Sequence, residues 1–356
     1  MRTVLLTIVA LMALAVLSGA AVVFGGLYNV SARAGHWPIT EWVLHTAYRQ
    51  SVKLRAPPEH EVPELTDALA ALGARHFDRA CRQCHAAPGE ERTATIERMM
   101  PRPPPIEVAV RDWDPRHLGW ILREGVKMSG MPGWPSSRQD EMWSVVAFLV
   151  RVQGGMDAQT YAALTETPEA RGPEGLGYCA GCHGLDGRSG NPHIPRLDLL
   201  DAAYLTESIT AYDRGLRESG IMSHAASEFM PEQLDRLVAY FGSLPAAAEP
   251  QPADPTLAAR GRDLAHAATA DPEVPACAAC HGPEANPASP MGPGPAIAGQ
   301  YETYLGTQLR LWREGARGGG PQAQLMRAAA RDLSDEDIAA LAAYYASLLP
   351  SADRDG

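Results

Sequence analysis

The sequence predicts an all-α protein that carries three tandem domains of similar size behind an N-terminal transmembrane helix. No segment shows the period-two alternation of polar and apolar residues that is typical of a half-buried strand. One five-residue motif occurs three times, and 98 residues separate the first cysteines of successive copies. This spacing indicates a repeat about the size of one small domain. Residues 4–28 contain no charged side chain, which is typical of a membrane-spanning helix.

The repeated motif has the form Cys-x-x-Cys-His and contains every cysteine of the chain. On a helical turn, residues i, i+3 and i+4 share a face, so two thiols can bond the vinyl groups of one porphyrin while the imidazole reaches its iron. A bare Cys-x-x-Cys also occurs in zinc sites and redox dithiols, but three copies with no cysteine left over favour haem. The sequence therefore predicts three covalently bound haem c groups. The predicted attachment and proximal ligand residues are Cys81, Cys84 and His85, then Cys179, Cys182 and His183, and finally Cys277, Cys280 and His281.

Residues 1–30 are predicted to be a membrane anchor or signal segment. A helix of the uncharged run would reach roughly 37 Å, which is longer than the hydrocarbon core of a bilayer, about 30 Å. The small residues at 18–20 resemble a signal-peptide cleavage site, and cleavage is the alternative. However, the apolar run continues beyond them, and Tyr28, Trp37 and Trp42 follow where an interfacial aromatic belt would lie. We expect an uncleaved anchor that places the haem domains on the periplasmic side of a bacterial cytoplasmic membrane.

The remaining chain divides at proline-rich stretches. Residues 31–61 are predicted to be a membrane-proximal interfacial segment, because apolar and basic side chains interleave there as in a helix lying on an anionic surface. The alternative is an amphipathic helix packed on the first domain. The predicted domains are domain 1 (62–161), domain 2 (166–245) and domain 3 (255–350), with the clearest linker at 245–255.

Each domain is expected to contain the same parts in the same order. A helix leads into the motif, a loop rich in glycine and proline follows, and a middle helix comes next. A methionine then lies in an irregular stretch before an amphipathic helix closes the domain. The closing helix of domain 3 is expected to begin after Ser334, which is a favourable N-cap residue.

A haem iron held by histidine needs a second axial ligand, and methionine gives an electron-transfer site of raised potential. Met222 and Met326 each lie 18 residues before a tyrosine of the closing helix, and Met131 lies 17 residues before a phenylalanine there. The predicted distal ligands are therefore Met131, Met222 and Met326. Core packing is the alternative role of any single methionine, but the recurrence at matched positions favours ligation.

Two other methionines compete with this assignment. Met128 lies three residues before Met131, and Met230 lies eight residues after Met222. Aligned with domain 3, Met230 occupies the N-cap position that Ser334 takes, which is a poor place from which to reach a haem. Rival histidine ligands share no common position; they are His117, His193, His224 and His266.

A ligating imidazole usually donates the proton of its other nitrogen to a carbonyl oxygen, which fixes its tautomer. Pro195 and Pro295 lie where they could present that carbonyl in the second and third domains, and residues 103–105 contain the candidate of the first. The alternative is that these prolines only stiffen the loop at the haem edge.

The charge balance indicates which partners to expect. Lysine and arginine total 31 against 42 aspartate and glutamate residues, which gives a formal net charge of −11. This balance argues against a nucleic-acid partner. A negative surface could steer a basic redox protein into place, although solubility accounts for the charge equally well.

Each domain resembles a class I cytochrome c domain, with an early Cys-x-x-Cys-His, a proline loop, a distal methionine and a closing helix that contains Ala-Tyr or Ala-Phe. Domains 2 and 3 together resemble the tandem dihaem cytochromes c of bacterial respiratory chains, through Pro-Arg-Leu at 195–197, Pro-Ala-Ile-Ala-Gly-Gln at 295–300 and the Tyr-Leu pairs at 204–205 and 304–305. Domain 1 resembles a membrane-bound monohaem cytochrome c. Domain 2 departs from the pattern in two ways: no Gly-Gln follows its Pro-Arg-Leu, and only 39 residues separate its histidine from its methionine.

The resemblance implies a membrane-anchored trihaem carrier that transfers single electrons without substrate chemistry of its own. Its expected partners are redox proteins: a quinol-oxidising complex, a dehydrogenase, a terminal oxidase or a soluble cytochrome. One alternative is the cytochrome subunit of a periplasmic dehydrogenase. Another is a haem peroxidase, which would need an iron with an open or displaceable ligand site.

Overall fold

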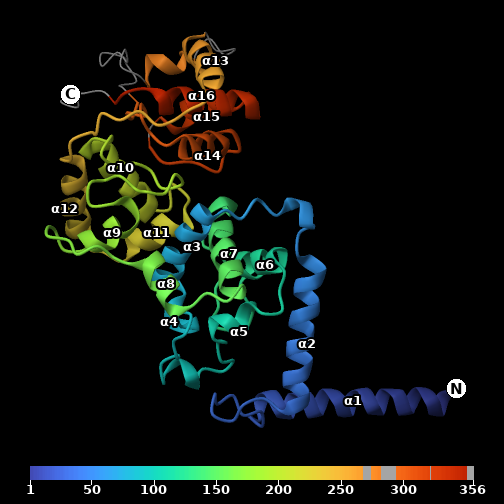
Figure 1. Cartoon of the computed structure of the whole chain (residues 1–356). Helices are drawn as coiled ribbons and strands as arrows, with labels where there is room; N and C mark the ends of the chain where they lie inside the picture. Colours follow the sequence, from blue (N-terminus) through green and yellow to red (C-terminus); the bar gives the residue numbers. More distant parts are fainter. Residues whose placement is uncertain (268–273, 282–293, 321, 351–356) are drawn as a thin grey trace.

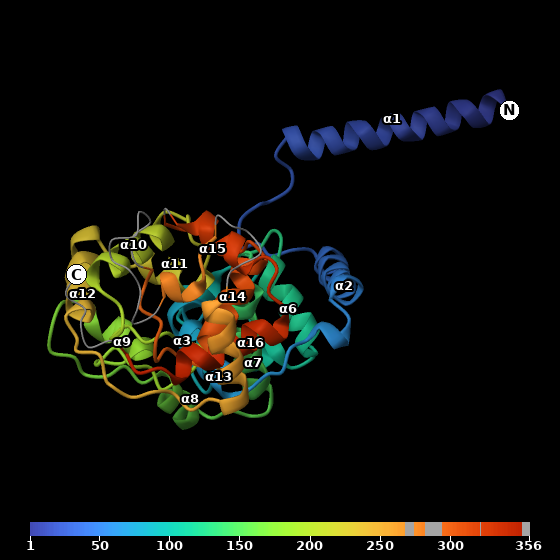
Figure 2. The ribbon, with the colours of Figure 1, turned by 90° about the horizontal axis from the view of Figure 1, so that it is seen from above.

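The computed structural model describes residues 1–267, 274–281, 294–320 and 322–350. Within these residues the protein is all-α and contains no strand, as predicted. The helices gather into three groups that follow one another along the chain, and each group has its own buried core (Figure 1). The N-terminal helix α1 (Arg2–Phe24) extends away from all three (Figure 2). It is long and apolar enough to cross a membrane, and none of its residues is buried.

Helix α2 (Pro38–Arg55) follows α1 in the chain and lies alongside domain 1 (Figure 1). Tyr48 and Val52 on its C-terminal half pack against the core of domain 1. Arg49 forms a 3.2 Å ion pair with Asp112. The C-terminal half of α2 is therefore packed on domain 1, as the alternative prediction had it. The N-terminal half and the residue before it expose large apolar side chains. These are Trp37, Ile39, Trp42, Val43 and Leu44.

Domain 1 is built on two crossing helices, α3 (Asp67–Ala80) and α7 (Gln139–Gln153). Thr66 caps α3 by accepting a hydrogen bond from the Leu69 amide. The helices cross closely because Gly73 has no side chain: a Cβ there would overlap the carbonyl oxygen of Ser144. The other helices of this part of the chain are η1 (Glu59–Glu61), α4 (Arg82–His85), η2 (Ile96–Arg98), α5 (Ile106–Val110), α6 (Pro115–Glu124) and α8 (Ala158–Thr165).

The Gly73→Ala chain is expected to lose about 2 kcal/mol of unfolding free energy, because the clash of the new methyl group with backbone exceeds the gain in helix propensity. Gly306 provides the matched control. It also lies in a buried helix, but a Cβ there would make only ordinary contacts of 3.6 Å or more. Gly306→Ala should be neutral or slightly stabilising. Chemical denaturation of both variants measures the difference, and equal effects would contradict the close crossing.

Domain 2 contains α9 (Leu176–His183), α10 (Ala202–Asp213), α11 (Gly220–Ser227) and α12 (Pro231–Gly242). The expected separate helix before its motif is absent: residues 166–175 contain no helix, and the motif lies at the end of α9 itself. Pro168 and Pro173 lack the amide hydrogen that a helix interior needs. Helix α3 of domain 1 instead packs on α9.

Domain 3 repeats the crossing of domain 1 with α13 (Pro255–His266) and α16 (Asp335–Ser347), which meet where a Cβ on Gly261 would overlap the Ala340 carbonyl oxygen. Ser334 is the N-cap of α16, as predicted. The other helices are η3 (Cys277–Ala279), α14 (Glu302–Arg313) and α15 (Ala323–Ala330).

The expectation of an irregular stretch around the methionines is wrong for domains 2 and 3. Met222 lies on α11 and Met326 on α15. Residues 323–330 consist of strong helix formers: half are alanine, and the others are leucine, methionine, glutamine and arginine. On α11, Ser219 supplies an N-cap and accepts a hydrogen bond from the Met222 amide at 2.8 Å. Met131 of domain 1 does lie in a loop.

Candidate haem sites

Each Cys-x-x-Cys-His motif forms a turn in which the histidine follows the first cysteine by one helical turn. The amide of His85 donates to the carbonyl oxygen of Cys81 at 3.1 Å, and that of His281 to Cys277 at 2.8 Å. None of the six cysteines is paired in a disulfide. Burial raises the pKa of Cys81 to about 12, with the nearby Cys84 adding to the rise. A redox dithiol needs a lowered thiol pKa, so this environment favours attachment of a group over thiol redox chemistry.

The three proximal histidines make the hydrogen bonds that the sequence predicts. The Nδ1 atom of His85 lies 2.8 Å from the carbonyl oxygen of Pro104. The corresponding distances are 3.3 Å from His183 to the Pro195 carbonyl and 3.0 Å from His281 to the Pro295 carbonyl. In each domain the carbonyl fixes the proton on Nδ1, so Nε2 is the nitrogen that can bind iron.

Burial also keeps these imidazoles in the form that binds metal. It lowers the pKa of His183 to about 4, and it lowers the pKa values of His85 and His281 as well. A neutral imidazole at physiological pH is the species that coordinates iron. The donor set and its protonation state therefore fit a haem iron at each motif.

Domain 3 contains a further buried polar atom beside its motif. The Tyr345 hydroxyl on α16 is buried and has no hydrogen-bond partner among the residues that the structure describes. Burial raises its pKa, and the nearby Cys277 raises it further. Buried polar groups normally have a partner, so a haem attached at Cys277 and Cys280 is a group that could supply one.

The methionines preferred from the sequence are partly buried, and their two competitors face solvent. Met131 packs against the core of domain 1, whereas Met128 is 84% exposed. Met230 is 64% exposed and is the N-cap residue of α12, the position that Ser334 holds in domain 3. These placements favour Met131 and Met222 over Met128 and Met230.

The rival histidines have other surroundings. His117 belongs to the capping box of α6, and His266 Nδ1 lies 2.8 Å from the carbonyl oxygen of Arg262 one helical turn earlier. His224 lies on α11, where its ring contacts the ring of His76 from domain 1. Desolvation lowers the pKa of His193.

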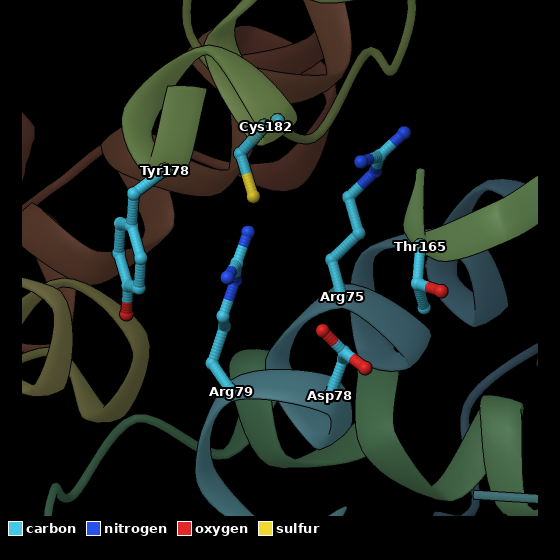
Figure 3. Close-up of a pocket in the computed structure, with 7 residues that line it drawn as sticks. Arg75, Asp78, Arg79, Thr165, Tyr178 and Cys182 are labelled. Carbon is cyan, nitrogen blue, oxygen red and sulfur yellow. The ribbon is translucent and has the colours of Figure 1, made fainter. Parts of the chain in front are cut away.

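Domain 1 packs directly against α9, the helix of domain 2 that contains its Cys-x-x-Cys-His motif. Arg75 and Arg79 extend from α3 toward α9, where Tyr178 and Cys182 lie (Figure 3). The Arg79 guanidinium lies 4.5 Å from the centroid of the Tyr178 ring, a cation–π contact. Cys81 is the C-cap residue of α3, so the helix that leads into the motif of domain 1 also contacts the helix that contains the motif of domain 2.

A histidine is enclosed in the same interface. His76 on α3 is buried, with ring centroids 5.1 Å from Trp134 and 5.8 Å from His224. Burial lowers its pKa to about 4, and the nearby His224 lowers it further.

The sign of the pH effect follows from this lowered pKa. An unfolded chain, with a histidine pKa of about 6.5, takes up more protons than the folded chain between pH 6.5 and 4. The stability that neutral His76 contributes is therefore complete above about pH 6.5 and is lost as the pH falls toward 4. We expect a cost of about 2 kcal/mol between pH 7.5 and pH 5. His76→Phe should remove this part of the pH dependence in denaturant titrations. An unchanged pH dependence would exclude His76 as its source.

Domains 2 and 3 meet through a reciprocal arrangement of arginine and tyrosine. Arg317 donates to the Tyr204 hydroxyl at 3.1 Å, and Arg217 donates to the Tyr304 hydroxyl at 3.4 Å. Gln308 accepts from both arginines. Burial by itself would raise the pKa of Tyr204, but the two arginines outweigh it and lower that pKa.

Buried polar contacts between domains were not predicted from the sequence. Arg196 and Asp198 form a buried ion pair beside domain 3, and Glu141 of domain 1 accepts hydrogen bonds from residues 219–221 of domain 2. The only sequence signal was the Pro-Arg-Leu at 195–197. A charge on an amphipathic helix, such as Glu141 in α7, looks the same in the sequence whether it faces solvent or another domain.

Comparison with known proteins gives two family matches. Residues 68–149 match the model described as cytochrome C oxidase, cbb3-type, subunit III, and residues 258–349 match the model described as cytochrome c. The chain is 34% identical to the thiosulfate dehydrogenase electron acceptor of Stutzerimonas stutzeri, over 48% of this chain and 78% of the relative. It is 32% identical to cytochrome c4 of Pseudomonas aeruginosa, over 50% and 88% of the two chains. The solved structure of reduced cytochrome c4 from Pseudomonas stutzeri aligns with 49% of this chain and 96% of its own, at 29% identity and a TM-score of 0.42.

Proposed function

Because the chain belongs to the class I c-type cytochrome family and is an electron-transfer cytochrome, we propose that it is a membrane-anchored trihaem carrier. It passes single electrons between respiratory donors and acceptors on the periplasmic side of the cytoplasmic membrane. The observation that carries the proposal is the threefold motif, whose histidine in each copy meets a proline carbonyl through Nδ1. A haem c bound at each motif supplies an iron that gains and loses one electron.

The residues of the chain have three tasks in this function. The two cysteines of each motif hold the porphyrin, and the proline carbonyls orient His85, His183 and His281. Met131, Met222 and Met326 would each supply the second protein ligand of one iron, which would raise its potential. The buried apolar cores of the three domains would limit the access of water to bound haems.

The contacts between domains support an electron path from domain 1 through domain 2 to domain 3, or the reverse. Domain 2 touches domain 1 through α3 and α9. It touches domain 3 through Arg217 and Arg317. Since domain 2 contacts both of its neighbours, its haem would exchange electrons with both others.

Helix α1 is proposed to anchor the chain, with the N-terminal half of α2 at the membrane surface. The large apolar side chains that α2 exposes suit the headgroup region of a bilayer. This arrangement would keep domain 1 close to membrane-bound redox partners.

The partner class that we propose is a periplasmic dehydrogenase or a respiratory complex that donates one electron at a time. The printed name of the Stutzerimonas relative, an acceptor for thiosulfate dehydrogenase, supports a dehydrogenase as one candidate donor. The net charge of −11 suits a partner with a basic docking surface.

The experiment is to purify the chain with its haems from membranes and to measure haem per polypeptide. We expect three haems in the wild-type chain and two in each double variant that replaces both cysteines of one motif by alanine. Fewer than three haems in the wild type would refute the trihaem proposal. Rapid binding of carbon monoxide or peroxide by one wild-type haem would instead favour the peroxidase alternative.

A further inference from the structure

The helix that carries Met222 is held at its N-terminus by a carboxylate of another domain. Glu141 lies on α7, the long helix near the end of domain 1, and its side chain is buried. One carboxylate oxygen accepts from the Ser219 hydroxyl at 2.6 Å. The other accepts from the amides of Gly220 and Ile221, at 2.7 Å and 3.2 Å. These are the first residues of α11, so a negative charge from domain 1 caps this helix of domain 2.

The hydrogen bonds continue from Glu141 to the ligand residue itself. The Ser219 hydroxyl that donates to Glu141 also accepts from the Met222 amide at 2.8 Å. On the other side, the Arg138 guanidinium lies 2.7 Å from Glu141 and fixes its carboxylate. A short series of charge-assisted contacts therefore runs from Arg138 through Glu141 and Ser219 to the backbone of Met222.

Packing holds the same end of α11 independently of charge. Gly220 lies against the Trp134 ring so closely that a Cβ there would be 2.5 Å from the ring atoms. About one turn further along α11, the His224 ring contacts the ring of His76 in domain 1. Domain 1 thus contacts α11 before and after Met222.

We propose that Glu141 is a positioning residue for the distal ligand of the domain 2 haem, so that docking of domain 1 sets the redox potential of that haem. The proposal rests on the proposed function, since it requires Met222 to be an iron ligand. Its physical basis is that the 8-residue helix α11 is too short to be stable by itself. Its register and tilt therefore depend on what binds its unpaired amides.

The test uses the full-length chain with its haems and compares Glu141→Ala, Glu141→Gln and Met222→Ala. The control is Glu232→Ala, which removes an exposed acidic residue from the first turn of α12. Spectroelectrochemical titration gives the three potentials, and the weak red absorbance band of Met-ligated ferric haem counts the intact ligand sets. Amide hydrogen exchange at residues 220–222 reports on α11 without reference to electron transfer.

We expect Glu141→Ala to change the reduced-to-oxidised ratio of one haem at least tenfold at a fixed potential, which corresponds to about 59 mV. Exchange at 220–222 should become faster, and the haem affected should be the one that Met222→Ala affects. Glu141→Gln keeps an acceptor oxygen for the two amides but loses the ion pair with Arg138, so a smaller shift of the same haem is expected. Glu232→Ala should leave all three potentials unchanged.

The outcomes separate this inference from the function on which it rests. If Met222→Ala shifts one haem but Glu141→Ala leaves all three within twofold of the wild type, the positioning role is overturned and the carrier function stands. If Met222→Ala shifts no haem, the ligand assignment fails and the inference with it. If Glu141→Ala does not fold, Glu141→Gln decides, and an unshifted haem in that variant overturns the proposal.

Discussion

Replacing Met131, Met222 or Met326 by alanine is expected to lower the potential of a different haem in each variant. The fall should be on the order of a tenth of a volt or more, since axial ligands span about 0.8 V in haem proteins. A thioether favours the reduced iron, and its loss leaves a position that water or an added ligand can occupy. The altered haem should therefore also bind carbon monoxide when reduced, while the other two haems keep their spectra.

Spectroelectrochemical titration of each variant measures the three potentials, and two methionines provide matched controls. Met128 and Met230 are both largely exposed, so their alanine variants should leave every potential unchanged. The domain 2 pair is the most informative, because the short separation between its histidine and Met222 made this ligand the least certain from the sequence. A shifted haem in Met230→Ala together with unshifted haems in Met222→Ala would reverse the assignment.

The sequence predicted correctly those features of the structure that depend on residues close together in the chain. The motif turns, the Ser334 cap and the bonds from proximal histidines to proline carbonyls all lie within about twenty residues of chain. A fixed loop length and the rigid φ of proline constrain such contacts strongly. The all-α fold also followed directly, because helical periodicity and the absence of strand patterns are local signals.

Sequence patterns within one domain did not predict where a helix of one domain takes the place of a helix in the next. Domain 2 was expected to have its own leading helix, but α3 of domain 1 packs there against α9. Residues 323–330 are a different case, because their high alanine content favours a helix by propensity. The expected irregular stretch around Met326 conflicts with this local preference. The cap that Glu141 supplies to α11 joins residues 78 to 80 positions apart. No periodicity or spacing within one domain can indicate such a contact.

The contacts of Arg196 with other parts of the chain could not be predicted from spacing within one domain either. Its replacement is expected to have the largest effect on stability. Its side chain is 1% exposed and that of Asp198 is 0% exposed, and the guanidinium makes two bonds to the carboxylate, at 2.9 Å and 2.6 Å. It also donates to the carbonyl oxygens of Gly299 in domain 3 and Ala247 in the linker, each at 3.0 Å. Arg196 therefore joins domain 2, the linker and domain 3 at one point.

Arg196→Ala should cost about 3–5 kcal/mol of unfolding free energy, because it removes the guanidinium that makes two hydrogen bonds to the buried Asp198 carboxylate. Arg188→Ala is the matched control: Arg188 pairs with Asp186 two residues away, but both side chains are exposed, so a loss below about 1 kcal/mol is expected. The double variant Arg196→Met, Asp198→Leu should recover part of the loss by removing the buried carboxylate together with the guanidinium, but not all of it, because the Gly299 and Ala247 carbonyls stay without their donor. Denaturant titrations of the three variants measure these differences. Equal losses for Arg196→Ala and Arg188→Ala would mean that water reaches the Asp198 carboxylate and that the contact between domains 2 and 3 depends instead on the arginine–tyrosine pairs.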